Sequence, residues 1–157
     1  MYLHERQAEG HEPPLPSTLD IIKQKEWFRD KAYLDSAWIP TIGYGFTSIN
    51  GRPVKMGDTI TQAQADEYLP QKVAQYQNFK KFITVPLTPA QESALTSFEY
   101  NLWPNIWKKD AMPIIEAINK WDIQSAGNYM KQYVNSGWQY VQWLANRRAY
   151  EAQLLNA

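Results

Sequence analysis

The spacing of apolar residues changes from a helical to an extended pattern within the first third of the chain. Ser17 and Asp20 have the spacing of a helix-capping box, with Asp in place of the preferred Glu. Leu19 and Ile22 follow at helical spacing. This pattern predicts a helix that begins at Ser17 and ends near residues 26–28.

Short stretches of β-branched and aromatic residues follow, from about residue 31 to residue 60. Glycines punctuate them at positions 43, 45, 51 and 57. The dipeptide Asn50-Gly51, flanked by such stretches, is a strong signal for a tight hairpin. We therefore predict a small antiparallel sheet of two or three strands in this segment.

Helical spacing returns after residue 60 and continues to the end of the chain. Thr61 and Gln64 have the spacing of a capping box, which predicts a helix that runs toward Phe79. Pro70 lacks the backbone N–H that a helix interior needs. We therefore expect this helix to be kinked or broken at Pro70.

A second capping box pairs Thr88 with Gln91 and has Pro89 at the first helical position. The helix that it predicts runs through Leu102 and is the most apolar of the chain, so we expect it to be the most buried. Shorter helices are predicted near residues 111–120 and 122–134. After an interruption at Gly137, a last helix is predicted from about residue 141 to residue 155.

Together these elements predict an α+β fold with two lobes. A lobe with a small antiparallel β-sheet is expected over about residues 17–75, and a mainly helical lobe over about residues 76–157. The cleft between two such lobes is a natural place for a polymer substrate. We interpret residues 17–157 as one domain, and the polar, proline-ended residues 1–16 as a flexible arm.

The composition argues against several classes of function. The 157 residues include 16 basic and 16 acidic side chains, so no net charge favours nucleic acid or an anionic membrane. Cysteine is absent, and the two histidines, His4 and His11, lie in the polar N-terminal segment. We therefore expect no disulfide, no metal site and no cofactor. We also find no signal peptide and no apolar run long enough to insert into a membrane.

Aromatic residues are numerous, with seven Trp and ten Tyr. Most of these rings are interpreted as core residues. Flat rings also offer apolar faces with polar edges, so the alternative for a few of them is to line a sugar-binding cleft.

Two carboxyl groups and a hydroxyl are the candidate catalytic groups. Glu26 lies at the predicted helix end, where the helix dipole and the apolar neighbours Trp27 and Phe28 favour its protonated form. Acid-catalysed cleavage of a glycosidic bond needs such a carboxylic acid. Asp35, in a predicted turn, could hold a water molecule that the hydroxyl of Thr41 helps to orient. Taken singly, each of these residues is also compatible with an ordinary surface or turn position.

In combination with the glycine turn, these residues resemble the T-even phage lysozyme family, glycoside hydrolase family 24. The resemblance runs from about residue 17 to residue 155. The matching residues are Glu26, Tyr33, Asp35, Thr41-Ile42-Gly43-Tyr44-Gly45, Gly57, Ile60-Thr61, Gln64, Leu87-Thr88, Gln91, Ala94-Leu95, Ser97-Phe98, Tyr100-Asn101, Arg147-Arg148 and Glu151. The spacing of Glu26, Asp35 and Thr41 around the glycine turn is specific to this family.

The resemblance implies a lysozyme-like domain that acts on peptidoglycan glycan strands. It would hydrolyse the β-1,4 bond between N-acetylmuramic acid and N-acetylglucosamine, as a muramidase. By this resemblance Glu26 is the proton donor, and Asp35 and Thr41 hold the attacking water. Attack on the face opposite the leaving group makes inversion of configuration the expected outcome.

The resemblance also assigns expected roles around these three residues. Arg147 falls where the family places an arginine that pairs with the catalytic glutamate, and it is expected to support the site. Thr47, on the hairpin, is expected to contact sugar. Tyr100 and Asn101, on the central helix, are expected to face the cleft and contact sugar as well.

Two residues depart from the family pattern. Trp27 stands where many relatives carry Gly after the catalytic Glu, and Phe46 stands where many carry His after the Gly-Tyr-Gly turn. We expect Trp27 to narrow access to Glu26. Phe46 removes a possible ion pair under the hairpin, which should affect mainly stability.

Two other functions stay open: a non-catalytic wall-binding or structural virion module, and a lytic transglycosylase, which leaves an anhydro-muramic product. Delivery also has two alternatives. A monomeric endolysin without a signal peptide would stay in the host cytoplasm until a separate holin-type protein opens the membrane. A virion-associated lysozyme would instead arrive with the phage particle.

Overall fold

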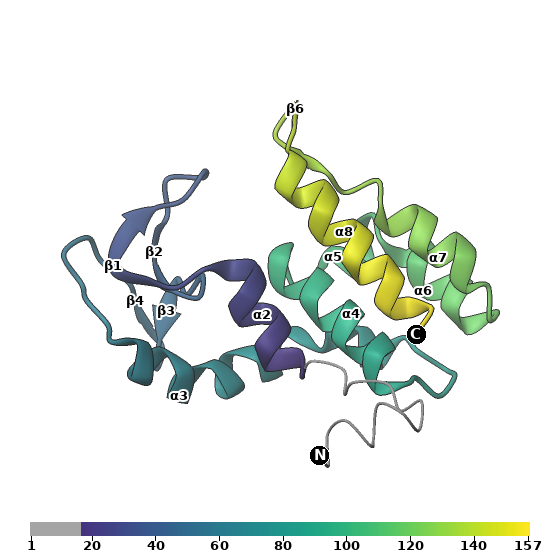
Figure 1. Cartoon of the computed structure of the whole chain (residues 1–157), viewed down its shortest axis with the longest axis horizontal. Coiled ribbons are helices and arrows are strands. Elements are labelled where there is room, and N and C mark those ends of the chain that lie inside the picture. Colours follow the sequence, from purple (N-terminus) through teal and green to yellow (C-terminus); the bar gives the residue numbers. More distant parts are fainter. Residues whose placement is uncertain (1–16) are drawn as a thin grey trace, which may run out of the picture.

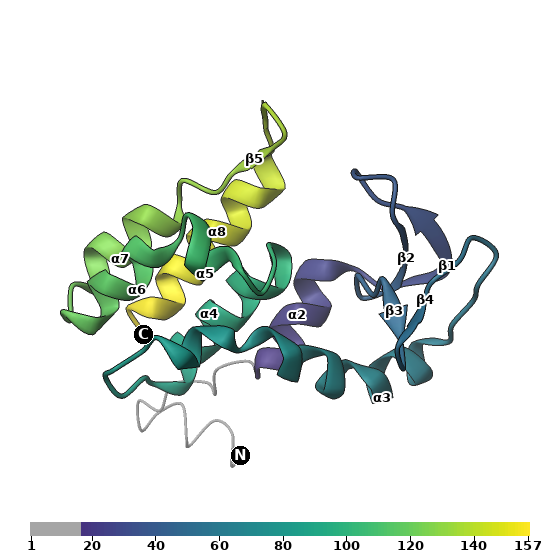
Figure 2. The same cartoon turned by 180° about the vertical axis from the view of Figure 1, so that it is seen from behind.

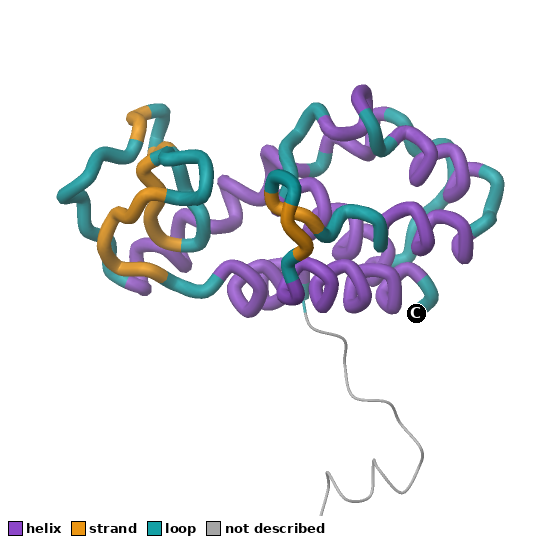
Figure 3. Tube along the Cα trace, turned by 90° about the horizontal axis from the view of Figure 1, so that it is seen from above, coloured by secondary structure: helices purple, strands orange, loops and turns teal. Residues whose placement is uncertain are grey.

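A computed structural model describes residues 17–157 and shows two lobes joined by shared helices (Figure 1). The small lobe holds the strands β1 to β4 and helix α3, and the other lobe is built mainly of helices. Seen from above, most strands lie at one end of the molecule, the opposite end is helical, and one further short hairpin lies near the middle (Figure 3). The predicted α+β, two-lobed architecture is confirmed. The arm predicted for residues 1–16 lies outside the described residues.

Helix α2 (Thr18–Glu26) belongs to both lobes. Its first turn is capped as predicted, because the Ser17 hydroxyl accepts a hydrogen bond from the backbone N–H of Asp20 at 3.2 Å. Ile21 and Ile22 are both fully buried, yet Ile21 packs in the core of the helical lobe and Ile22 in the core of the small lobe. Helix α2 therefore links the two cores.

The small lobe contains two separate two-stranded sheets, so the prediction of one sheet with two or three strands is wrong. Strand β1 (Arg29–Leu34) pairs with β2 (Pro40–Gly43), and β3 (Ser48–Ile49) pairs with β4 (Arg52–Pro53), both antiparallel. Between β2 and β3 the chain folds back on itself through two backbone hydrogen bonds that Ile42 and Phe46 exchange, at 2.9 and 2.8 Å. This tight turn redirects the chain, so β3 does not extend the first sheet.

The hairpin predicted at Asn50-Gly51 is present between β3 and β4. Asn50 and Gly51 have φ values of 52° and 80°, which is the pairing of left-handed residues that a type I′ turn requires. The chemistry of this turn is local, which explains why the dipeptide alone predicted it.

Helix α3 (Gln62–Val73) begins at the predicted capping box, in which Thr61 and Gln64 exchange hydrogen bonds of 2.9 and 3.1 Å. It continues through Pro70, so the helix is not broken there, and the alternative expectation of a kink stays a prediction. Pro70 is exposed, whereas Leu69 and Val73 on either side are buried in the small-lobe core, and that burial offsets the missing hydrogen bond. The helix also ends earlier than predicted, because the chain continues as the 3₁₀ segments η1 (Ala74–Tyr76) and η2 (Asn78–Lys81).

The central helix of the large lobe is α4 (Pro89–Asn101), which begins at the predicted Thr88–Gln91 capping box. Around it lie α5 (Ile106–Lys109), α6 (Met112–Asn119), α7 (Ile123–Met130) and α8 (Gln142–Leu155). Helix α5 was not predicted, and α7 is shorter than the predicted 122–134 helix. Gly137 interrupts the helices in a short hairpin between β5 (Asn135–Ser136) and β6 (Gln139–Tyr140). In Figures 1 and 2, this hairpin and the β1–β2 hairpin project toward the same side of the molecule from opposite lobes.

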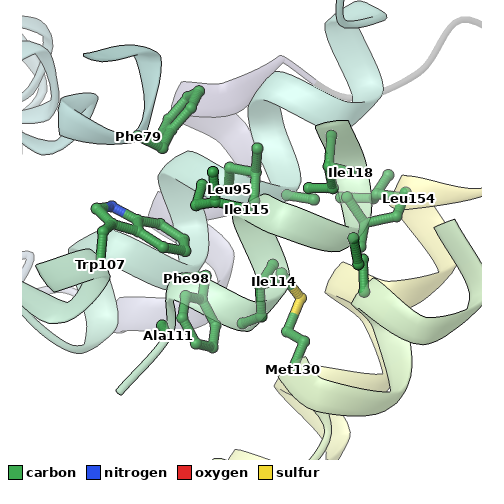
Figure 4. Close-up of a cluster of buried hydrophobic side chains, with 14 of the residues drawn as sticks. Phe79, Leu95, Phe98, Trp107, Ala111, Ile114, Ile115, Ile118, Met130 and Leu154 are labelled. Atoms are coloured by element: carbon green, nitrogen blue, oxygen red, sulfur yellow. The ribbon is translucent and has the colours of Figure 1, made fainter. Parts of the chain in front are cut away.

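Two hydrophobic cores support these elements. The core of the helical lobe is centred on Phe98, whose ring lies 5.4 Å from that of Trp107 (Figure 4). The small-lobe core is richer in aromatic rings: Phe46 is fully buried, 5.3 Å from the ring of Tyr68 and 6.2 Å from that of Tyr44. Phe46 thus fills the core beneath the glycine turn, which agrees with a mainly structural effect of this departure.

A buried carboxylate, that of Glu99 on α4, ties the 3₁₀ segment η2 to the helical lobe. It accepts hydrogen bonds from the backbone N–H of Phe79 at 3.1 Å and from the indole N–H of Trp107 at 2.7 Å. Within residues 17–157, no helix combines the length and the apolar character needed to cross a bilayer.

Candidate active site

Glu26 is the last residue of α2, and its carboxyl group is fixed from two sides. Its side chain is 15% exposed, and its Oε2 atom accepts a hydrogen bond from Nη1 of Arg147. Its Oε1 atom lies against Gly45 of the glycine turn. A Cβ atom on Gly45 would come within 2.8 Å of Oε1, and Gly45 has a φ of +82°, so both space and backbone conformation require glycine. The glycine turn and Arg147 thus set the position of this carboxyl group together.

Arg147 is buried and held by groups distant in the sequence. Its Nη2 donates to the backbone carbonyl of Ser97 at 3.0 Å, and its Nε faces the Ser97 hydroxyl at 3.3 Å and a Glu151 oxygen at 3.4 Å. Burial opposes the charge of the guanidinium, but the nearby carboxylates of Glu26 and Glu151 outweigh burial and raise the pKa of Arg147. Arg147 is therefore a permanent cation behind Glu26.

Glu151, which is fully buried, anchors this network. The Ser97 hydroxyl donates to Oε2 of Glu151 at 2.5 Å, and Nε of Arg148 lies 2.7 Å from Oε1. Arg148 in turn donates from Nη2 to the amide oxygen of Asn101 at 2.8 Å. The two arginines and the carboxylates of Glu26 and Glu151 balance in charge, which is the condition for keeping such groups out of water. The sequence signal that would have identified Glu151 is its i+4 spacing from Arg147 on one helix.

The ion pair of Glu26 and Arg147 lies in a pocket of about 590 Å³ between the two lobes. The pocket is lined by Gln24, Lys25, Glu26, Trp27, Arg29, Tyr33, Trp143, Asn146 and Arg147. Burial lowers the pKa of Lys25, and the like charge of the nearby Arg147 lowers it further. A second hollow, of about 370 Å³, lies on the small lobe beside Ile49 and Tyr68 and contains none of the predicted site residues. The pocket around the ion pair is therefore the candidate active site.

Asp35 forms a turn at the end of β1 and is half-exposed. Its Oδ1 atom accepts hydrogen bonds from the backbone N–H groups of Ala37 at 2.8 Å and Ile39 at 2.9 Å. Within residues 17–157, Oδ2 has no hydrogen-bond partner, so one oxygen of this carboxyl group is available to a ligand. Asp35 is not among the residues that line the pocket.

Thr41 is almost fully buried, and its hydroxyl donates to the backbone carbonyl of Ile39 at 2.9 Å. It pairs directly with Tyr33 across the β1–β2 hairpin, so the two side chains share one face. Tyr33 lines the pocket, which brings Thr41 behind the pocket wall. Burial raises the pKa of Tyr33, and the charges of Glu26 and Asp35 raise it further. Both carboxyl groups therefore act electrostatically on the Tyr33 hydroxyl.

The three residues predicted to bind sugar have different environments. Thr47 is exposed beside the glycine turn. Tyr100 is only 8% exposed, and its hydroxyl donates to the backbone carbonyl of Tyr44 at 2.6 Å, while burial raises its pKa. This position corrects the expectation that Tyr100 faces the cleft, because its ring supports the glycine turn from below. Asn101 is half-buried, and its amide oxygen is occupied by Arg148.

A family model, that of the phage lysozymes, matches residues 23–151. The chain belongs to the phage lysozyme family. Its structure superimposes with a TM-score of 0.79 on an endolysin from Escherichia coli O157:H7 phage FAHEc1, at 35% identity over 93% of this chain and 94% of that one. It is 29% identical to the endolysin of Salmonella phage P22 over 86% of this chain and 92% of that protein. It is 28% identical to the endolysin of Bacillus phage B103 over 87% of this chain, but it spans about half (51%) of the length of that relative. Membership of the phage lysozyme family supports peptidoglycan hydrolysis as the activity.

The departure at Trp27 has a structural consequence in this family member. Trp27 has a φ of 53°, in the left-handed region where glycine is favoured, and its side chain is 77% exposed on the pocket. The chain therefore keeps the backbone turn after Glu26 but adds a large ring to it.

Proposed function

We propose that this phage lysozyme is a muramidase that cleaves the β-1,4 bond between N-acetylmuramic acid and N-acetylglucosamine. The observation that carries the proposal is the carboxyl group of Glu26, held in the pocket between the lobes by the buried cation of Arg147. Protonation of a glycosidic oxygen requires a carboxyl group that is held in a fixed orientation in a cleft, and Arg147 supplies that orientation.

The two oxygens of Glu26 have different tasks in this mechanism. Arg147 occupies Oε2, so Oε1, beside the Cα atom of Gly45, is the oxygen that transfers the proton to the leaving group. The ion pair prevents rotation of the carboxyl group, and this preorganisation contributes to the rate through orientation.

Asp35 and Thr41 supply the water in the proposal. The free Oδ2 atom of Asp35 accepts one hydrogen of the water and takes up that proton as the water attacks the sugar, while Glu26 gives its proton to the leaving oxygen. The Thr41 hydroxyl, which already donates to Ile39, accepts the other hydrogen of the water. The negative charge of Asp35 also stabilises the positive charge that develops on the sugar ring. Water held on the side opposite Glu26 would give inversion of configuration.

Two alternatives to this mechanism make different products. A lytic transglycosylase needs one carboxyl group and no water, and it leaves an anhydro-muramic end. A non-catalytic wall-binding or virion module would bind the wall and leave the glycan intact. Asp35 and Thr41 belong to the hairpin that carries the pocket-lining Tyr33, and the presence of these two groups favours hydrolysis over both alternatives.

The test is digestion of purified peptidoglycan by the wild type and by Glu26→Gln, followed by mass spectrometry of the products. We expect reducing muramic ends from the wild type and no cleavage by Glu26→Gln, which keeps the shape of the side chain and removes the acid. Anhydro ends would replace the proposal with a transglycosylase. Near-full activity of a folded Glu26→Gln variant would show that the acid is assigned to the wrong residue.

The cell wall is the proposed site of action, with peptidoglycan as the binding partner and the monomer as the acting species. Release from the host cytoplasm through a holin-type membrane lesion and arrival on a virion are both compatible with this function. Fractionation of infected cells and of purified phage particles with an antibody against the chain separates the two routes.

A further inference from the structure

Trp27 combines two unfavourable features that its own packing does not offset. Its φ of 53° lies in the left-handed region, which costs free energy for any residue with a side chain. Trp27 as a whole is 77% exposed, so little apolar surface is removed from water in return. Strained residues of this kind persist where the surrounding structure holds them in place, and they cluster at catalytic and ligand-binding sites.

Trp143 presents a second exposed ring to the same pocket. It lies near the start of α8, one helical turn before Arg147, so the two side chains are on the same face of that helix. Trp143 is 53% exposed and lines the pocket together with Trp27. Trp27 follows Glu26 directly, whereas Trp143 precedes Arg147 by one turn. Each half of the ion pair thus has a tryptophan beside it, one from each side of the pocket.

We propose that Trp27 and Trp143 form an aromatic clamp that binds one sugar ring of the glycan strand next to Glu26. The inference deepens the muramidase proposal and rests on it. The apolar C–H faces of a pyranose ring pack on aromatic faces, and its hydroxyl and acetamido groups need polar partners at the edges. Arg29, Tyr33 and Asn146 line the same pocket and supply those partners.

Backbone strain alone does not define the clamp, because a third tryptophan provides a contrast. Trp121 has a φ of 63° and is 62% exposed, but it lies between α6 and α7 and does not line the pocket. Trp121 is therefore a matched control, since the same substitution there changes the same kind of backbone and removes the same ring, away from the ion pair.

The affinity test uses a soluble oligosaccharide of alternating N-acetylglucosamine and N-acetylmuramic acid, titrated calorimetrically into protein that carries Glu26→Gln to prevent cleavage. In this background we expect Trp27→Gly and Trp143→Ala each to raise Kd about tenfold. Trp27→Phe and Trp143→Phe should retain affinity within about threefold, because a flat ring remains. Trp121→Gly should bind like its parent.

Thermal unfolding separates binding from folding. Glycine accepts the left-handed conformation, so Trp27→Gly should have an unchanged or higher Tm while its affinity falls. A ring whose role is to hold the fold together would give the opposite result, with a lower Tm and an unchanged Kd for the molecules that stay folded. If Trp143→Ala lowers Tm, Trp143→Phe replaces it in this comparison of Tm with Kd, because Phe keeps a flat ring at that position.

Cleavage by variants with Glu26 intact distinguishes failure of this inference from failure of the muramidase proposal. We expect Trp27→Gly to raise KM for peptidoglycan more than it lowers kcat. Normal cleavage and normal affinity in Trp27→Gly and Trp143→Ala would overturn the clamp and leave the muramidase standing. Absence of cleavage by the wild type would overturn the muramidase, and the clamp as part of it, whatever the titrations give.

Discussion

The two sides of the candidate active site are held in different ways. On the side of the helical lobe, Arg147 contacts Ser97 and Glu26, which are 50 and 121 residues away in the sequence, and its guanidinium is buried. On the side of the small lobe, Asp35 and Thr41 make hydrogen bonds to residues no more than four positions away. One side depends on tertiary packing and the other on a local turn.

This difference separates stability from activity. Substitutions on the side of the helical lobe should lower both, because they leave buried charges without partners. Substitutions in the local turn should lower activity with little change in the free energy of unfolding. The following variants test the comparison in order of their expected effect on that free energy.

Arg147→Ala should have the largest effect. It leaves the buried Glu151 with Arg148 alone and removes the partner of Glu26, which should lower the free energy of unfolding by about 3–5 kcal/mol and abolish cleavage. Urea denaturation and peptidoglycan digestion measure the two effects. Arg29→Ala is the control, because Arg29 also lines the pocket but is exposed, and its removal should change stability by less than about 0.5 kcal/mol. Equal stability of the two variants would contradict the comparison.

Gly45→Ala should lower both stability and rate. The new Cβ atom would meet Glu26 Oε1 at 2.8 Å and force the carboxyl group away, which should reduce kcat about 100-fold. The positive φ adds a destabilisation of about 1–3 kcal/mol. Gly51→Ala has a similar φ of +80° but meets no atom within 4 Å, so it should lose stability without losing kcat. The same kcat in both variants would show that Gly45 does not position Glu26.

Tyr44→Phe tests how the glycine turn is attached to α3. The Tyr44 hydroxyl donates a hydrogen bond to Asp66 at 2.6 Å, and this bond is the largest cause of a lowered pKa of Asp66. Burial of Asp66 raises its pKa by a smaller amount, and Lys23 lowers it further. A carboxyl group with a lowered folded-state pKa stabilises the fold at pH values above its unfolded-state pKa of about 4. This stabilisation is lost as the pH falls from there through the lower folded-state pKa. The variant should therefore be about 1 kcal/mol less stable than the wild type at pH 7, and the difference should shrink below about pH 4. Denaturation curves at several pH values measure this; a gap that widens in acid would contradict the assignment.

Asp35→Asn should have the smallest effect on stability and still lower activity. The amide oxygen of Asn can accept both turn hydrogen bonds, from Ala37 and Ile39, so the free energy of unfolding should change by less than about 0.5 kcal/mol. Cleavage should fall because the charge is removed. Asp35→Ala, which also loses the turn contacts, should lower stability further. Wild-type cleavage by Asp35→Asn would limit Asp35 to a structural role.

Sequence patterns predicted the elements whose determinants are local. The capping boxes at Thr61 and Thr88, the cap at Ser17 and the Asn50-Gly51 turn all act within three residues, and each begins or turns an element as predicted. The ion pair of Glu26 with Arg147 was expected from the family resemblance alone, since no local rule connects residues 121 positions apart.

The errors arose where tertiary contacts override local preference. Helix α3 continues through Pro70 because its neighbours on both sides are buried. Burial of Tyr100 depends on a contact with Tyr44, 56 residues away. The left-handed backbone of Trp27 has no sequence signal of its own, because tryptophan rarely adopts it.

Ile21 and Ile22, which are neighbours on helix α2, belong to different cores, so the position of this helix depends on both lobes being folded. Cleavage should therefore require the whole folded chain. Helix α2 ends in Glu26, so loss of either core would release the element that carries the proposed acid. A partly unfolded molecule with one intact lobe would then be unable to cut the wall. Limited proteolysis that removes one lobe should accordingly abolish activity in a single step, with no partly active fragment.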